Sequence, residues 1–401
     1  MSRRVVIITE LIAPYRIPVF NALACCPGVD LHVIFLAETD LTQRHWLVYK
    51  DEIRFSYEVL PSWRRKVGQL NLLLNRGVRA ALRRAAPDVI VCGGYNYVAS
   101  WNALRWAQLN GAHFFLWVES TAKDLRKNHR WVESLKERFL SACDGFVVPG
   151  KSSRDYLLSY GVPDERIFTA PNAVDTEFFS TCSEMVRKSA AESRKRLGLP
   201  ARFFLFVGRL LVVKGVFDLL DAYEALTPKL RREIGLVFVG TGPAEAELRR
   251  RAVSITPGSI VIAGFVQREQ LPAFYALANV FVFPTHSDPW GLVVNEAMAC
   301  GLPVICSSAA GCGADLVKHG WTGRIVGAGD VDELASTMNE LTRDAEQRSR
   351  MGQRGQKRIL QYSPEAWAAA VARAIYSAES HKSSRQAEAV KADLQSMIVE
   401  R

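Results

Sequence analysis

Two carboxylates eight residues apart, Asp288 and Glu296, fall within the segment HSDPWGLVVNEAMACG at 286–301. The apolar run 278–284 before them predicts a strand, and the pattern after a short turn predicts a helix over 290–301. In an open parallel sheet, a helix that begins where a strand ends offers N–H groups and a partial positive charge to an anion. Glu296 would lie in the second helical turn, where sugar or ribose hydroxyls could donate hydrogen bonds to it. The segment therefore predicts a cradle for a ligand with an anionic group and a diol.

Two cations lie at the end of another predicted strand. The run RFFLFV at 202–207 predicts a buried strand, Arg209 follows it, and Lys214 precedes the helical sequence VFDLLDAYEAL. Arginine can bind phosphate through two parallel hydrogen bonds and lysine acts as a compact charge, so the pair would neutralise a diphosphate. Each feature alone has an ordinary explanation, since Asp288 could be a helix N-cap, Glu296 a solvated group, and the cations surface residues. Their occurrence in one half of the chain favours the functional interpretation.

Four segments in this half carry a resemblance to a known family. They are VGRLLVVKG at 207–215, VGTGP at 239–243, GFV at 264–266 and DPWGLVVNEAMACGLPVI at 288–305. Their order and spacing resemble those of the family-four retaining glycosyltransferases, and VVPGKSSRDYLLSYGVPDERIFTAPNAVD at 147–175 is similar to the segment that ends the N-terminal domain of that family. The resemblance implies an α/β protein of GT-B fold. It would have two doubly wound Rossmann-like domains that face a cleft and a C-terminal helix that crosses back to the first domain.

The resemblance also implies a role for each matching residue. Arg209 and Lys214 would hold the diphosphate of a nucleotide-sugar donor and stabilise the leaving nucleotide, and Glu296 would bind the ribose hydroxyls. Asp288 stands at the first acidic position of the family's Glu, seven residues, Glu signature, which usually faces the donor sugar, and its side chain is one methylene shorter than glutamate. The other residues implied on the donor side are Gly208, Gly242, Phe265, Val266, Trp290, Gly291 and Leu292.

Strand-end loops of the first domain should line the acceptor cleft. They carry Tyr15, Arg16, Tyr95, Asn96 and Glu119. Many relatives have a histidine in the loop where this chain has WVEST, so Glu119 takes the place of that histidine. Glu119 could act as a general base toward an acceptor hydroxyl. Two alternatives stay open, because a front-face retaining reaction could leave deprotonation to the departing phosphate and Glu119 could be a structural carboxylate.

Length and composition fit a two-domain globular protein. The chain has 401 residues, of which 49% are hydrophobic and 23% charged, and strand and helix patterns alternate along it. We expect an acceptor-binding domain at 1–180, a linker at 181–200, a nucleotide-sugar domain at 201–362, and a crossover helix and tail at 363–401. The sequence has no run of about eighteen apolar residues and no metal-binding cysteine spacing. We therefore expect a cytoplasmic protein, and because no DxD-type motif appears where the donor is predicted, we expect neither a metal ion nor a cofactor.

The net charge of +10 is concentrated in part of the chain. The segment 59–87 contains seven basic residues and no acidic one, namely Arg64, Arg65, Lys66, Arg76, Arg79, Arg83 and Arg84. Tryptophan and leucine side chains alternate with them, which predicts peripheral contact with an anionic membrane on its inner face. The alternative is a solvated helix face with ordinary core contacts. Nucleic acid is not an expected partner, because no recognised binding motif accompanies the charge.

The sequence as a whole predicts a metal-independent retaining glycosyltransferase. Its donor would be a UDP- or GDP-linked sugar and its acceptor a hydroxyl of a glycan or lipid-linked molecule. Two alternatives share the fold, a nucleotide-sugar epimerase and a non-catalytic nucleotide-sugar-binding protein. A dinucleotide oxidoreductase is disfavoured because no GxGxxG motif follows the first predicted strand.

Overall fold

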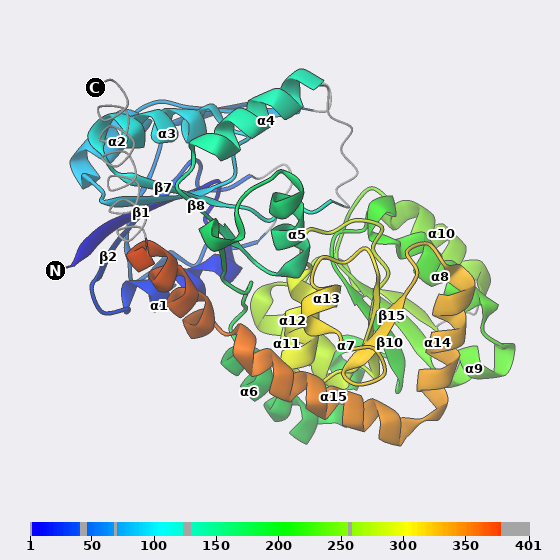
Figure 1. Ribbon diagram of the computed structural model, residues 1–401. Coiled ribbons are helices and arrows are strands. Elements are labelled where there is room, and N and C mark those ends of the chain that lie inside the picture. Colours follow the sequence, from blue (N-terminus) through cyan, green and yellow to red (C-terminus); the bar gives the residue numbers. More distant parts are fainter. Residues whose placement is uncertain (1, 41–45, 68–69, 123–129, 256–258, 378–401) are drawn as a thin grey trace, which may run out of the picture.

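The computed structural model describes residues 2–40, 46–67, 70–122, 130–255 and 259–377, and two parallel sheets organise them (Figure 1). The first sheet has seven strands in the order β3-β2-β1-β6-β7-β8-β9. Their bounds are β1 Arg3–Thr9, β2 Val29–Phe35, β3 Ser56–Val59, β6 Val89–Gly93, β7 His113–Trp117, β8 Gly145–Val148 and β9 Ile167–Thr169. The central strands are almost continuous apolar runs because helices cover both faces of the sheet.

Helices on the two faces of the first sheet define the first domain. The connecting helices are α1 Ile17–Ala24, α2 Val78–Ala85, α3 Val98–Asn110, α4 Arg130–Ala142 and α5 Lys151–Ser159, with the short 3-10 helices η1 Pro14–Arg16, η2 Lys50–Glu52 and η3 Asp164–Arg166. Strand β1 shows how the faces are separated, since Val6 and Ile8 pack in the core of α2 to α5 while Val5 and Ile7 pack in the core of α1. The residue period of two therefore places alternate side chains of one strand in different cores.

A helix formed by residues 364–377 completes the core on the α1 side (Figure 1). Trp367 is fully buried, with its ring centroid 5.2 Å from that of Trp117 and 5.8 Å from that of Phe20. The hydroxyl of Tyr376 donates to the carbonyl oxygen of Pro27 at 2.8 Å. The chain thus returns to the first sheet, as the resemblance implied, and the tail that we expected after this helix, at 378–401, lies outside the described residues.

The second sheet has six parallel strands in the order β12-β11-β10-β13-β14-β15. Their bounds are β10 Phe203–Val207, β11 Gly235–Val239, β12 Ile260–Ile262, β13 Val280–Phe283, β14 Val304–Ser307 and β15 Gly323–Val326. The surrounding helices are α8 Val216–Ala225, α9 Pro228–Glu233, α10 Glu245–Ile255, α11 Leu271–Leu277, α12 Leu292–Ala299, α13 Gly313–Leu316, α14 Val331–Arg343 and α15 Ala345–Ile359, with η4 Val212–Lys214, η5 Arg268–Gln270 and η6 Leu360–Tyr362. This second domain confirms the expected α/β fold with two Rossmann-like sheets.

Two further helices, α6 Thr176–Lys188 and α7 Ala190–Leu197, occupy the segment between the sheets. Helix α6 packs on α11 and α12 of the second domain, and Phe179 belongs to the core of that domain. The Arg187 guanidinium donates to the carbonyl oxygen of Cys300. The residues 181–200 that we expected as a linker are therefore largely helical and packed against the second domain.

The basic segment 59–87 contains a hairpin, which corrects the alternative of a solvated helix face. Strands β4 Ser62–Val67 and β5 Leu70–Asn75 pair antiparallel, and only Val78–Ala85 is helical. In this pairing Arg64 lies opposite the buried Leu73, and Arg64 forms ion pairs with Glu10 and Asp40. The alternation of exposed and buried residues has the period of a strand, so a helical pattern was the wrong interpretation. Among the helices of the described residues, none is long and apolar enough to cross a membrane.

Candidate functional site

The loops that follow three neighbouring strands of the second sheet are joined to one another by backbone hydrogen bonds. The N–H of Gly208, after β10, donates to the carbonyl of Val239, and the N–H of Gly240, after β11, donates to the carbonyl of Gly264, after β12. Gly240 has φ 137°, and a Cβ at this position would collide with the carbonyl oxygen of Gly208. A Cβ on Gly242 would likewise collide with the Leu210 carbonyl. Gly240 and the predicted Gly242 therefore allow close backbone approach at the carboxyl edge of the sheet, where the predicted Gly208 contributes the carbonyl that Gly240 approaches.

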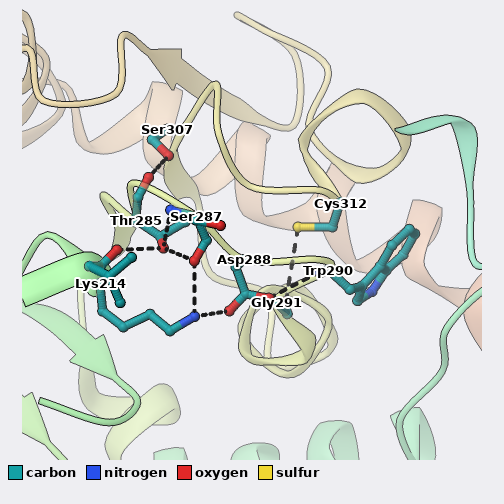
Figure 2. A network of polar contacts seen from close by, with 9 residues as sticks. Lys214, Thr285, Ser287, Asp288, Trp290, Gly291, Ser307 and Cys312 are labelled. Carbon is teal, nitrogen blue, oxygen red and sulfur yellow. Dashed lines mark hydrogen bonds and ion pairs between the residues drawn. The ribbon is translucent and has the colours of Figure 1, made fainter. Parts of the chain in front are cut away.

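Lys214 and Asp288 meet at this edge (Figure 2). The ammonium nitrogen of Lys214 is 2.6 Å from Oδ2 of Asp288, both side chains are 19% exposed, and the ammonium also donates to the carbonyl of Ser287 at 3.2 Å. The second carboxylate oxygen of Asp288 accepts the backbone N–H of Trp290 at 3.0 Å. Asp288 thus stabilises the turn before the helix and also neutralises the lysine. This turn delays the start of α12 to Leu292, two residues after the predicted start.

Thr285 holds together the loop that carries Asp288 and the loop that carries Lys214. It was not singled out from the sequence. It is fully buried, and its hydroxyl lies 3.2 Å from the carbonyl of Val213, beside Lys214, while accepting the N–H of Ser287 at 3.2 Å. Ser307, at the end of β14, donates its hydroxyl to the Thr285 carbonyl (Figure 2). The only sequence signal was a threonine directly after a strand, which is too common to indicate this role. Its contacts position the loop that carries Asp288 against the loop that carries Lys214.

Glu296 lies in the second turn of α12, as predicted, and its surroundings change its protonation. The hydroxyl of Tyr275, a fully buried residue of α11, donates to Oε2 of Glu296 at 2.7 Å. Burial raises the pKa of Glu296 to about 7, against which the Tyr275 hydrogen bond acts. Glu296 also lines a cavity of about 170 Å³ together with the predicted residues Phe265 and Val266. A carboxyl group in this place can exchange hydrogen bonds with hydroxyls of a ligand in the cavity.

Trp290, Gly291 and Leu292 form the turn and first residue of α12. Trp290 is only 3% exposed, and its indole N–H donates to Asn295 Oδ1 at 2.9 Å. Its backbone N–H is bound by Asp288, so Trp290 mainly anchors the turn. Gly291 is the N-cap and Leu292 the first residue of the helix, and their N–H groups are of the kind that a helix leaves without an intrahelical acceptor. The amide donors that we expected to face a ligand are therefore reduced to Gly291 and Leu292.

A polar cluster of the first domain lies across from α12. Glu119 forms an ion pair with Arg16 and accepts the side-chain N–H of Asn172 at 3.1 Å, and Arg16 donates to Asn172 Oδ1 at 3.0 Å. The carbonyl of Asn172 accepts the side-chain N–H of the buried Asn295 at 2.9 Å. These contacts connect Glu119 to Asn295 on α12. Asn172 and Asn295 were not predicted, because a buried asparagine has no distinctive sequence pattern.

The remaining predicted residues lie at different places. Arg209 is exposed in the loop after β10, and Phe265 is 41% exposed. Tyr15, which we assigned to the acceptor side, lines the same cavity as Glu296. Tyr95 has its ring centroid 6.1 Å from that of Phe139, and Asn96 is exposed after β6. In the described part of the chain, no three His, Cys, Asp or Glu side chains are grouped so as to hold a metal ion.

Comparison with known families assigns the chain to a class. The model described as Glycosyltransferase Family 4 matches residues 27–178, and the model described as Glycosyl transferases group 1 matches residues 189–358. These two segments cover most of both domains. The chain belongs to the group 1, family 4 glycosyltransferases.

Individual relatives match over shorter stretches. A D-inositol 3-phosphate glycosyltransferase of Thermomonospora curvata is 28% identical over 228 residues, which are 54% of this chain and 53% of the relative. The putative teichuronic acid biosynthesis glycosyltransferase TuaC of Bacillus subtilis is 39% identical over 132 residues, 32% of this chain and 31% of the relative. The first of these matches thus spans about half the length of the relative.

Solved structures match over almost the whole chain. The structure of Anabaena HepE in complex with UDP and glucose has a TM-score of 0.73 at 18% identity and covers 94% of this chain and 100% of that one. A sucrose-phosphate synthase from Thermosynechococcus elongatus has a TM-score of 0.69 at 19% identity, with coverage of 96% and 99%. At this level of identity the likeness shows the fold, which is GT-B.

Proposed function

We propose that the protein transfers a sugar from a UDP- or GDP-linked donor to a hydroxyl of a glycan or lipid-linked acceptor, with retention at the anomeric carbon. The observation that carries this proposal is the convergence of Lys214, Asp288 and the start of α12 at the carboxyl edge of the second sheet, with Glu296 one turn further at a cavity. The similar HepE structure holds UDP and glucose, which supports a nucleotide-sugar donor.

The chemistry follows from where negative charge develops. When the bond between the sugar and the diphosphate breaks, charge accumulates on the phosphate oxygens. Lys214, Arg209 and the N–H groups at the start of α12 would stabilise that charge, Lys214 by exchanging part of its contact with Asp288 for a phosphate oxygen. Positive side chains and a helix terminus suffice for this role, so the proposed reaction needs no metal ion and no cofactor.

Glu119 is the proposed acceptor-side group. Its carboxylate lies in the cluster with Arg16 and Asn172, across from α12. In one route it takes the proton of the acceptor hydroxyl while the sugar is transferred. In a front-face route the departing phosphate takes the proton, and Glu119 then orients the acceptor through its hydrogen bonds.

The hairpin β4–β5 offers a surface for the proposed peripheral contact with an anionic membrane. Trp63, Leu72 and Leu74 are exposed, and the pairing places Arg65 on the same face. Each basic residue near an anionic surface contributes about 1 kcal/mol of attraction. Co-sedimentation with phosphatidylglycerol vesicles should be lost when Trp63 and Leu74 are both replaced by serine, and retained when Val253 of α10, an apolar residue that is even more exposed, is replaced by serine. If the double variant and the Val253 variant sediment equally, this contact is contradicted. The proposed location of the protein on the inner face of the cytoplasmic membrane is then contradicted as well.

The donor site is tested by thermal stabilisation and calorimetry with a panel of UDP- and GDP-sugars. We expect one base to stabilise the wild-type protein and Arg209→Ala to weaken binding, whereas Arg249→Ala, which removes an exposed arginine of α10, should bind like the wild type. Stabilisation by no nucleotide sugar would overturn the proposal. Product analysis separates the alternatives, because an epimerase releases an altered nucleotide sugar without acceptor and a binding protein releases no product.

A further inference from the structure

A segment of the first domain forms one wall of the cavity that contains Glu296. Trp46 and Tyr49 of this segment line the cavity together with Phe265 and Val266 of the second domain. In a nucleoside the base is attached directly to the ribose. If the ribose hydroxyls bind Glu296, as the proposed function requires, the base must therefore lie within one sugar ring of that carboxyl group. The segment 46–52 is consequently placed to contact the base.

An ion pair fastens this wall to the second domain. Arg268, three residues after Phe265, donates from Nη1 to Oε2 of Glu52 at 2.9 Å and from Nη2 to the other carboxylate oxygen. Its guanidinium carbon lies 4.3 Å from the centre of the Tyr49 ring. The side chains of Arg268 and Glu52 are 21% and 35% exposed, so water screens the pair only partly. Two parallel charge-assisted hydrogen bonds of this kind fix orientation as well as distance.

The segment is also anchored within its own domain, independently of the Glu52 carboxylate. The side-chain N–H of Asn21, on α1, donates to the backbone carbonyl of Glu52 at 2.8 Å, and Asn21 Oδ1 accepts the N–H of Arg54 at 2.8 Å. A change confined to the Glu52 carboxylate therefore leaves the backbone attachment of the segment to α1 in place. Such a change removes the ion pair to Arg268 alone.

The aromatic side chains of the wall are held in a fixed arrangement. The rings of Trp46 and Tyr15 meet edge to face, with centroids 6.0 Å apart and planes at 89°. Backbone contact adds to this, because the N–H of Leu47 donates to the side-chain oxygen of Gln267 at 3.3 Å. Nucleobases of every kind stack on aromatic side chains. The wall thus combines an aromatic surface with a specific ionic attachment.

We infer that the nucleoside of the donor is bound by both domains, with Trp46 and Tyr15 of the first domain against the base and the Glu52–Arg268 ion pair as a latch that holds this wall closed. The inference rests on the proposed donor site and adds a binding surface that lies outside the second domain. Donor entry and product release then require the latch to open. Breaking the latch speeds both binding and dissociation, whereas truncating Trp46 weakens binding.

The test uses the full chain and measures association and dissociation rates for UDP and GDP by stopped flow. For Glu52→Gln we expect both rates to rise about fivefold with little change in Kd, the factor for an ion pair worth about 1 kcal/mol. Trp46→Ala should weaken nucleotide binding about tenfold and change the ratio of UDP to GDP affinity. Combining Glu52→Arg with Arg268→Glu should restore the slow rates. Glu340→Gln is the matched control, because it breaks an ion pair with Arg324 at the opposite edge of the second sheet.

Each outcome decides one of the two ideas. If the wild-type protein binds neither nucleotide, the proposed function fails. If it binds one of them and Glu52→Gln and Trp46→Ala both match the Glu340→Gln control, the donor site stands and the two-domain pocket is wrong. A fall in melting temperature without any change in the rates or in the UDP-to-GDP ratio would likewise refute the latch, since that result indicates a purely structural ion pair.

Discussion

Replacement of Glu296 by glutamine should make the stability of the protein less dependent on pH. Burial raises the pKa of this carboxyl group from 4.5 to about 7. Between these values the unfolded chain loses the proton while the folded protein keeps it, so rising pH favours the unfolded state. At about 1.4 kcal/mol per pKa unit, the loss amounts to about 3 kcal/mol once the pH exceeds 7.

Glutamine avoids this loss because it never ionises, and its amide oxygen can still accept the hydrogen bond of Tyr275. Below pH 4.5 the ionisation of Glu296 should therefore cause little difference between the free energies of unfolding of the wild-type protein and Glu296→Gln. At pH 8 the variant should be more stable by up to about 3 kcal/mol. Urea denaturation at pH 5, 6, 7 and 8 measures the difference, with Glu340→Gln as a control on a half-exposed carboxylate of α14.

Nucleotide binding should lower the pKa of Glu296, which is opposite to the effect of burial. Ribose hydroxyls that donate to Glu296 favour its ionised form, so nucleotide binding near pH 6.5 should release protons, and calorimetry in buffers of different ionisation enthalpy detects that release. The variant should bind the nucleotide more weakly and without this proton release. A stability difference between wild type and Glu296→Gln that is the same at pH 5 and pH 8 would refute the reasoning.

Four further predictions concern catalysis and packing. Lys214→Ala should lower kcat/KM for sugar transfer about 100-fold, because the positive charge that stabilises the leaving phosphates is lost. A change within twofold in steady-state assays would contradict that role. Activity should persist after dialysis against EDTA, and a strict requirement for added manganese would exclude the metal-independent reaction. Asn295→Ala should lower the free energy of unfolding by about 1–3 kcal/mol, because it leaves the buried Trp290 indole and Asn172 carbonyl without a partner, whereas Asn96→Ala on the surface should have almost no effect in the same urea titration. Trp367→Ala should lower stability by about 3–5 kcal/mol by opening a cavity under the first sheet, and an unchanged denaturation midpoint would contradict that packing.

Two strands of the second sheet could be predicted to within two residues. The predicted runs at 202–207 and 278–284 contain β10 at 203–207 and β13 at 280–283. Buried parallel strands are short apolar runs bounded by turns, which makes their ends visible in the sequence. Strand β9, Ile167–Thr169, was not predicted, because its three residues include the polar Thr169 and so form no apolar run. The alternative of a solvated helix face was wrong for the hairpin, whose leucines also fit a helical spacing.

The site was predictable where chemistry depends on side-chain type at the edge of a sheet. Lys214 and Asp288 were singled out from residue types and spacing, and the structure brings them into contact. Thr285, which positions the loops of these two residues, and Tyr275, which binds Glu296, act through burial and tertiary contacts that no local pattern encodes. Arg268 was missed for a similar reason, since its partner Glu52 lies in the other domain and is distant in sequence.

The return of residues 364–377 to the first sheet links the order of synthesis to the order of folding. The first domain is made early, yet one face of its sheet needs Trp367 and its neighbours to complete the core. Domains made first usually fold first as the chain emerges. Here the second domain, whose core contains no residue of this helix, can finish folding before the first. The first domain must then wait with an exposed apolar face, so a chaperone that binds nascent chains would find its site on β1, α1 and the strands beside them.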